Sequence, residues 1–242
     1  MIRKWWFLLP VILVPFLGIA IFNFAKHAPP AKDSSLESKL FIVANPLDLA
    51  QIQTISKFRS CVGHNYSGRN AEGETETLRS MKHYIQPREE LPTETISVFA
   101  PFDGKISEIR REFTRGSQVW ITPARVRGWQ FIFFHIDLAS EFDRSGVEVH
   151  SGQIIGRVNP ESQTNFDMGL KFFGIASQIF DSPFLYMNEL VLAEYAARGI
   201  TKENIIVSKV ERDNNPCQTL NGETGIDARF VGNGTSDWVE LR

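Results

Sequence analysis

The most constraining feature of this 242-residue chain is an uncharged, mostly apolar run near its N-terminus, from Trp5 to Ala25. A helix of about 20 apolar residues is long enough to cross the hydrocarbon core of a bilayer. Arg3 and Lys4 precede the run, and positive residues beside a span favour the cytoplasmic side. We therefore predict one transmembrane helix at residues 1–26, which holds the protein in a cell membrane as a single-pass protein with its C-terminal part outside the cytoplasm.

A cleaved signal peptide is the alternative for this segment. Such a peptide has a shorter apolar region that ends in small residues at a cleavage site. Lys26, His27 and two prolines follow the run here, and this pattern favours an uncleaved anchor. Residues 27–39 carry Pro, Ser, Lys and Asp without periodicity, as is typical of a linker. The remaining residues, 40–242, are enough for one domain with a sizeable core.

Composition limits the class of partner. Lys and Arg number 26 and Asp and Glu 28, so the formal net charge is −2. No overall field draws such a chain to nucleic acid, and we expect no nucleic-acid partner. Hydrophobic residues make up 43% of the chain and 19 residues are Phe, which indicates a folded core and not a disordered chain.

Two cysteines, Cys61 and Cys217, stand far apart in the sequence. An oxidising compartment outside the cytoplasm permits a disulfide between them, which would tie the first part of the domain to its last. Two buried free thiols are the alternative. The oligomeric state is not indicated by the sequence.

Short β-like runs separated by turn residues dominate the middle of the chain. Phe131–Phe134 is apolar at every position, so we expect a central strand that is covered on both faces. Glycines between the runs suit hairpin turns. The expected strands are residues 96–99, 104–106, 118–121, 129–135, 153–158, 205–207 and a closing strand at 238–241.

Two helices are also predicted. Residues 47–58 carry apolar side chains at mostly helical spacing, and Asn45 before a proline is a reasonable N-cap. The second helix, residues 183–198, begins with a proline in its first turn and stops at Gly199. The sequence thus predicts a mainly β domain with a few helices.

Three segments occur in an order that resembles a known family. Residues 98–106 read VFAPFDGKI, residues 134–136 read FHI, and residues 147–156 read VEVHSGQIIG. Lysostaphin-type (LytM-like) zinc metallopeptidases have an "APxDGxV" hairpin, a strand ending in "HL" and then "VxxGQxIG" in the same order. The resemblance covers residues 80 to 172 and implies their antiparallel β-sandwich, a duplicated hybrid motif.

The resemblance also implies a set of site residues. The family binds zinc through the His and Asp of an "HxGxD" strand and the second His of "HxH", and the "HL" histidine assists catalysis. His83 takes the place of the first ligand and His135 that of the "HL" histidine. Three protein ligands leave one position open for a water that zinc acidifies.

Two of the three ligands are missing in this alignment. Pro87 stands where the Asp should be, and residues 165–172, where "HxH" should lie, contain no histidine. We therefore expect a peptidase-like domain that has lost hydrolytic function, needs no cofactor, and binds a cell-envelope polymer or a protein partner. The alternative is an active zinc metalloendopeptidase with a rearranged site, in which His64 and Asp167 supplement His83 and His135.

Ordinary structural roles compete with these functional ones. His83 on a short polar strand can be a hydrogen-bonded surface residue and His135 can cap a strand end, while His150 and Asp103 fit turns. A biotinyl or lipoyl carrier domain is a further alternative, since Met81-Lys82 resembles the modified lysine motif. That lysine follows the "AP.dG" hairpin in carriers but precedes it here.

Overall fold

The computed structural model describes residues 40–162, 166–174, 178–231 and 234–242. The predicted anchor at 1–26 and linker at 27–39 lie outside these residues. Within the described ranges, no helix combines the length and the hydrophobicity that a bilayer span requires.

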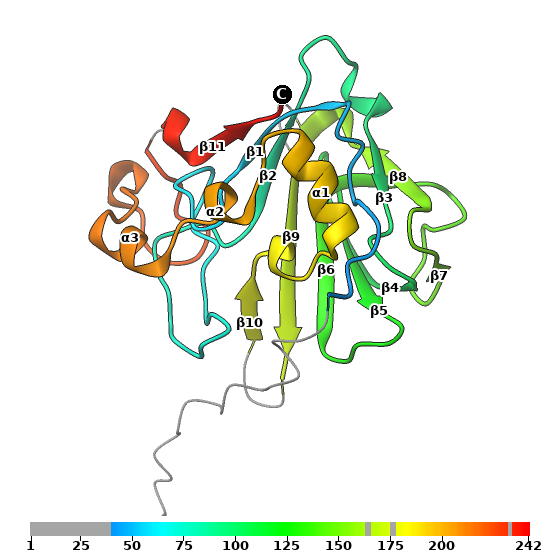
Figure 1. Ribbon diagram of the computed structural model, residues 1–242, viewed down its shortest axis with the longest axis horizontal. Coiled ribbons are helices and arrows are strands. Elements are labelled where there is room, and N and C mark those ends of the chain that lie inside the picture. Colours follow the sequence, from blue (N-terminus) through cyan, green and yellow to red (C-terminus); the bar gives the residue numbers. More distant parts are fainter. Residues whose placement is uncertain (1–39, 163–165, 175–177, 232–233) are drawn as a thin grey trace, which may run out of the picture.

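Eleven strands form a mainly antiparallel sheet, which confirms the predicted fold class at the level of a β-rich domain with few helices. The order of the main path is β11-β1-β2-β9-β6-β5-β4-β7, with β10 beside β9 and with β8 joining β3 to β6 (Figure 1). The strands are β1 (Ile52–Ser56), β2 (His83–Pro87), β3 (Ser97–Phe99), β4 (Gly104–Glu112), β5 (Gly116–Pro123), β6 (Trp129–Leu138), β7 (Glu148–Val149), β8 (Ile154–Val158), β9 (Phe166–Phe173), β10 (Gln178–Asp181) and β11 (Trp238–Glu240).

Strand β6 is the central strand that the apolar run predicted. It pairs with β5 on one side and with β9 on the other. Phe131 and Phe133 point into the main hydrophobic core, whereas Ile132 and Phe134 belong to a second apolar cluster on the opposite face. Side chains alternate between the two faces of a strand, so one apolar run serves two layers.

The main core lies between one face of the sheet and a cover of two separate segments. One is the stretch of residues 41–49, and the other is helix α1 (Glu189–Ala197), which crosses that face in Figure 1. Val191 and Tyr195 of α1 are buried, and the Tyr195 hydroxyl donates to Asn45 Oδ1 at 2.9 Å. The opposite face of the sheet is therefore the one left for the candidate site.

The predicted helix at 47–58 is wrong, because its second half is strand β1. The register of β1 against β2 shifts between Ile52 and Thr54. This bulge turns both Ile52 and Ile55 toward the core, at a spacing of three that imitates a helix. Asn45 caps a turn instead, since its Oδ1 accepts from Leu47 N at 3.1 Å.

The predicted helix at 183–198 is correct in part. Its first turn is a separate 3₁₀ helix, Pro183–Leu185, and α1 begins only after Asn188, whose side chain accepts from Val191 N. The helix is interrupted between Leu185 and Glu189, where Met187 forms a parallel β-bridge with Ile42 of the stretch of residues 41–49. Gly199, with a φ of +87°, follows the end of α1 as predicted.

The predicted strand at 205–207 is wrong, whereas the closing strand was predicted correctly as β11. Residue 205 ends helix α2 (Lys202–Ile205), and Ile206 makes one isolated bridge to Phe58. Asn204 Oδ1 accepts from the backbone N of Thr201, which fixes the start of this short helix. The other helices are α3 (Lys209–Asn214) and the 3₁₀ turns Thr93–Thr95, Pro160–Ser162, Leu220–Gly222 and Thr235–Asp237.

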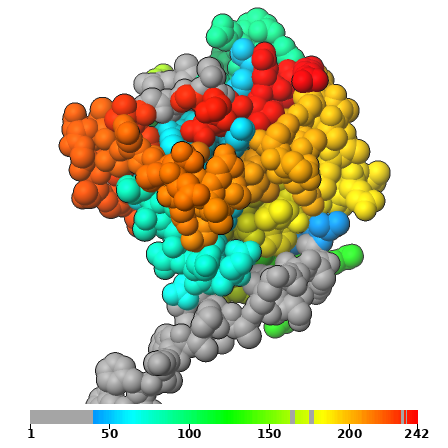
Figure 2. Space-filling model, turned by 60° about the vertical axis from the view of Figure 1, so that its left-hand side comes forward, coloured from blue at the N-terminus to red at the C-terminus, as the bar shows by residue number. Residues whose placement is uncertain are grey.

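The predicted disulfide is present. Cys61 and Cys217 are bonded, with their Cα atoms 5.2 Å apart and a sequence separation of 156. Figure 2 shows the segments after residue 200 (orange to red) lying against the loop of residues 60–80 (cyan). Backbone hydrogen bonds join the two, among them Asn65 N to Ala228 O at 2.7 Å. The disulfide therefore fastens the C-terminal segments to a loop that carries part of the candidate site.

Candidate functional site

The candidate site lies on the face of the sheet opposite the main core. Strand β9 pairs there with β2 and β6, and Asp167 lies opposite both Tyr84 and Phe134. We call the ionisable side chains that gather around Asp167 the polar cluster: His64, Lys82, Glu112, His135 and Asp167. It lies next to the second apolar cluster, which contains Trp120, Ile132, Phe134, Tyr66 and Phe173.

Lys82 is at the centre of the polar cluster. Its Nζ donates to Asp167 Oδ2 at 2.6 Å and lies 3.3 Å from His64 Nε2. The side chains of Lys82 and Asp167 are 2% and 0% exposed, so this ion pair is fully buried. Burying a charge is unfavourable unless it is paired, and here each partner compensates the other.

Three aromatic rings surround the Lys82 ammonium. Nζ lies 4.9 Å from the ring centre of Tyr66, 4.7 Å from that of Tyr84 and 4.5 Å from that of Phe134. Burial lowers the pKa of Lys82, but the Asp167 carboxylate and the two phenol groups outweigh it and hold the pKa above its ordinary value. The ammonium is therefore charged at neutral pH, in an environment of ring faces that attract cations.

His64 accepts from this ammonium as a neutral ring. Burial and the charge of Lys82 lower the pKa of His64, although Asn65, Asp167 and Asp227 act in the opposite direction. Its Nδ1 lies 3.2 Å from the carbonyl oxygen of Asn65 and 3.2 Å from Asp227 Oδ1. Both are acceptors, so the proton belongs on Nδ1 and leaves the Nε2 lone pair for Lys82.

His135 joins the cluster from β6. Its Nδ1 lies 2.6 Å from Glu112 Oε2, and its Nε2 lies 3.8 Å from Asp167 Oδ2. Burial raises the pKa of Glu112, but hydrogen bonds from His135 and Gln118 outweigh it and lower that pKa. His135 has a φ of +63°, beside a register shift between β5 and β6. This irregular backbone brings His135 onto the same face as its neighbour Phe134.

His83 does not join the others. It points to the opposite face of β2, where its Nδ1 donates to Ser56 O at 2.7 Å and its Nε2 lies 2.8 Å from Ser182 Oγ. Complete burial lowers the pKa of His83 to about 4, so the ring is neutral. The structure thus brings together His64, His135 and Asp167 but places His83 in the core, because adjacent residues of a strand face opposite ways.

The zinc that the family resemblance implies does not fit this cluster. Among the described residues, no group of three or more His, Cys, Asp or Glu side chains is arranged to hold a metal ion. Zinc needs electron-pair donors, whereas the group between His64 and Asp167 is an ammonium, which only donates hydrogen bonds and already supplies a positive charge. Asp167 Oδ1 remains buried without a hydrogen-bond partner.

Sequence reasoning missed Lys82, Tyr66 and Glu112 as members of the site. Lys82 was considered only as a carrier-type lysine, although it stands two residues from Tyr84 and so shares its face of the sheet. Glu112 ends a strand of polar side chains, which gives no signal of a partner 23 residues away. The other two candidates behave as turn residues: Asp103 Oδ1 accepts from Ser151 N at 2.9 Å, and His150 is exposed.

Comparison with known proteins gives structural neighbours alone. No family model matches the sequence, and no curated protein matches it. A putative glycyl-glycine endopeptidase LytM from Ruminococcus gnavus is 19% identical, with 43% of this chain and 44% of that chain covered and a TM-score of 0.35. A structure of the SpoIIQ-SpoIIIAH pore forming complex is 15% identical, covers 67% and 100%, and has a TM-score of 0.43.

A zinc-containing peptidase from Vibrio cholerae is a further neighbour, at 16% identity, with 56% of this chain and 37% of that chain covered and a TM-score of 0.36. This chain therefore spans less than half of the Ruminococcus gnavus and Vibrio cholerae chains. The structural neighbours include LytM-like peptidase domains, the family that the motifs of residues 98–156 resemble.

Proposed function

We propose that this chain is a peptidase-like domain of the lysostaphin β-sandwich type that binds a ligand without hydrolysing it. The ligand is a cell-envelope polymer or a protein partner, and the N-terminal helix holds the domain at the outer side of the membrane. The observation that carries the proposal is the Lys82–Asp167 ion pair, 2.6 Å long and fully buried at the centre of the polar cluster.

The Lys82–Asp167 ion pair leaves too few free electron-pair donors for a catalytic zinc ion. A catalytic zinc site needs three protein ligands and an open position for water. Asp167 is the one carboxylate beside both His64 and His135, and its Oδ2 is already bonded to a charged ammonium. Removing that ammonium from its aromatic surroundings would leave Asp167 buried and unpaired, which is strongly unfavourable. The cluster is thus stable without a metal ion.

The test is a hydrolysis assay on the full chain in detergent, with added zinc and a glycine-rich peptide or purified peptidoglycan as substrate. We expect sedimentation with peptidoglycan, or capture by a protein partner, and no cleavage. His135→Ala is the matched variant, because it removes the histidine that would act on a transition state. Zinc-dependent cleavage that His135→Ala abolishes would refute the proposal and establish the second candidate, a zinc metalloendopeptidase.

That second candidate has one observation in its favour. His64, His135 and Asp167 do meet on one face, and Asp167 Oδ1 has no hydrogen-bond partner among the residues that the structure describes. For it to hold, Lys82 would have to leave the cluster when zinc binds. Zinc titrations at increasing pH test this. A Lys82 amine released to solvent would lose its proton near its ordinary pKa, whereas the Lys82 that is paired with Asp167 keeps it.

The proposed location rests on the uncharged run from Trp5 to Ala25 and on Arg3 and Lys4 before it. The disulfide supports it, since such bonds persist in oxidising compartments. Protease added to intact cells should remove residues 40–242 from the membrane fraction. Protection of the domain in intact cells, with cleavage after permeabilisation, would contradict the proposed orientation.

A further inference from the structure

Lys171 is a second buried lysine on the same face, and no acidic side chain of the described residues forms a salt bridge with it. It is 8% exposed, on strand β9. Its Nζ lies 4.5 Å from the ring centre of Phe180, 4.7 Å from Tyr66 and 5.3 Å from Trp120. Unlike Lys82, it makes no ion pair with any described residue, so its charge is compensated only by ring faces.

Two further donors belong to the same place. Trp120 is 4% exposed. Its indole Nε1 is buried and has no hydrogen-bond partner among the described residues. The guanidinium of Arg110 lies on the Trp120 ring, with Cζ 4.5 Å from its centre. Arg110 Nε donates to Glu108 at 2.6 Å, and its other nitrogens make no hydrogen bond within the described part of the chain. Buried donors are normally satisfied, so an unpaired indole N–H requires an explanation.

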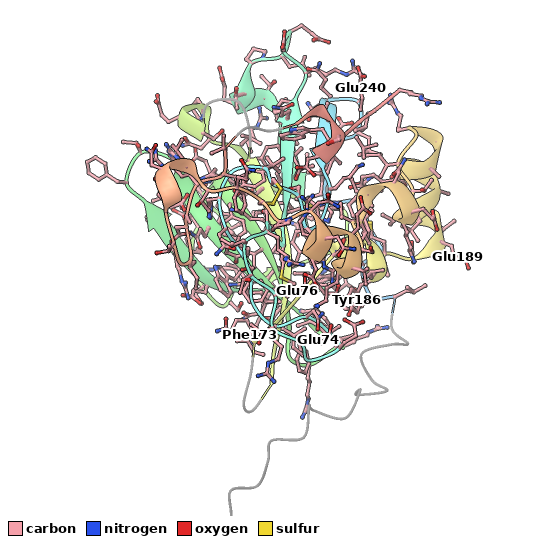
Figure 3. All side chains as sticks on the ribbon, turned by 90° about the vertical axis from the view of Figure 1, so that its left-hand side faces the viewer. Glu74, Glu76, Phe173, Tyr186, Glu189 and Glu240 are labelled. Carbon is pink, nitrogen blue, oxygen red and sulfur yellow. A yellow bond between two sulfur atoms is a disulfide. The ribbon has the colours of Figure 1, made fainter. Side chains whose placement is uncertain are left out.

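The charges around Lys171 also favour an anionic ligand. Burial, together with the positive charges of Arg110 and Lys82, lowers the pKa of Lys171 to about 8. Glu108 is paired with Arg110 and Asp167 with Lys82. Phe173 packs on Trp120, with 5.9 Å between the ring centres. Figure 3 labels Phe173 near Glu74 and Glu76 in its view of the molecule.

We propose that Arg110, Trp120 and Lys171 form a binding site for an anionic oxygen group, a carboxylate or a phosphate, carried by the ligand of this domain. Such a group accepts from all three donors and supplies the negative charge that Lys171 lacks. The site deepens the proposed binding function by naming the chemistry of the ligand. It stands on side chains outside the polar cluster, so its failure would leave the assays for zinc and hydrolysis unaffected.

The test is a titration of the full chain in detergent, followed through the ¹⁵N-indole signal of Trp120, which Trp120→Phe assigns. Inorganic phosphate and acetate are added in separate arms at constant ionic strength, set with chloride. We expect a saturable shift of this one indole signal with at least one of the two anions. The ratio of the two affinities then tells whether the site prefers phosphate or carboxylate.

Variants distinguish a built site from general attraction. Lys171→Met keeps an apolar chain of similar length and should weaken binding by about tenfold or more, the usual value of a charge-assisted hydrogen bond. Arg110→Gln, at an exposed position where folding is safe, should weaken it severalfold. Lys105→Met removes an exposed lysine of the same strand as Arg110 and is the matched control. A shift that does not saturate, or that Lys171→Met, Arg110→Gln and Lys105→Met reduce equally, would overturn the proposal.

Discussion

Lys82 connects the chemistry of the candidate site to the stability of the domain. Its ammonium touches a carboxylate, a neutral imidazole and three ring faces, which come from the loop of residues 60–80 and from strands β2, β6 and β9. A single side chain thus neutralises Asp167 and joins the loop of residues 60–80 to strands β6 and β9. The same contacts that make the site unsuitable for zinc make it a rigid part of the fold.

Replacing Lys82 should therefore be costly. Lys82→Met leaves Asp167 buried and unpaired, and we expect the free energy of unfolding to fall by about 3–5 kcal/mol. Urea denaturation at pH 7 measures this change. Lys105→Met, which removes an exposed lysine, is the control and should change stability by less than about 0.5 kcal/mol. Equal stabilities of the two variants would show that the ion pair does not form.

His83 predicts a pH dependence of stability. Burial lowers its pKa to about 4 in the folded protein, against an ordinary value of 6.5. Between these values the unfolded chain binds a proton that the folded one does not, so stability is present above pH 6.5 and is lost as the pH falls toward 4. The loss amounts to about 3 kcal/mol for this residue.

The measurement compares wild type with His83→Gln by urea denaturation from pH 4.5 to 7.5. The difference in stability between the two proteins should shrink as the pH falls, because only the wild type loses the contribution of His83. His64 remains in both proteins, so its own pH dependence cancels. A difference that stays constant over this range would mean that His83 keeps its ordinary pKa.

At the scale of elements, the sequence predicted strands well where side chains alternate and poorly where a distant segment decides. The runs that became β3, β4, β5, β6 and β8 were all expected, since local turns and apolar patterns define them. β1 was mistaken for a helix because a bulge gave its isoleucines a spacing of three. The break before α1 depends on pairing with Ile42, more than 140 residues earlier, which no local pattern reports.

The site followed the same division. His64, His135 and Asp167 were named from the sequence and do lie together. Lys82, and not His83, faces the polar cluster, because an offset of one residue in a strand sends a side chain to the other face. The alignment of a motif alone does not fix that offset. The pairing of Tyr84 with Asp167 fixes it in the structure.

Strand β6 stores strain where it delivers His135 to the cluster. A φ of +63° is unfavourable for a residue with a Cβ, and glycine adopts it without penalty. We expect His135→Gly to be more stable than His135→Ala by about 1 kcal/mol, since both lose the contact with Glu112 and only the glycine relieves the backbone. Thermal and urea denaturation of the two variants measure the difference. An alanine variant that is the more stable would contradict this backbone conformation.

At the scale of the whole molecule, the disulfide closes the chain on itself. Cys61 precedes His64 and Tyr66 by a few residues, and Cys217 lies in the C-terminal segments that pack on the same loop. The bond therefore restrains the loop that supplies two members of the site. Sequence reasoning could predict the pairing because the chain has two cysteines and no others.

Removing this bond should destabilise the domain without changing its fold. With a sequence separation of 156 between the cysteines, the bond restricts the unfolded chain strongly, and we expect Cys61→Ser with Cys217→Ser to lower the free energy of unfolding by about 2–5 kcal/mol. The same loss should follow from reducing the wild type with dithiothreitol. If the reductant destabilised the double variant equally, its effect would not come from this bond.

The zinc content of the purified full chain tests most directly whether the polar cluster holds a metal ion. Protein is produced in zinc-supplemented medium and its metal is measured by mass spectrometry, alongside Asp167→Asn. We predict no stoichiometric zinc in either protein, because the Lys82 ammonium holds Asp167 and a tetrahedral zinc site needs several free donors. About one zinc per wild-type chain, lost in Asp167→Asn, would contradict it.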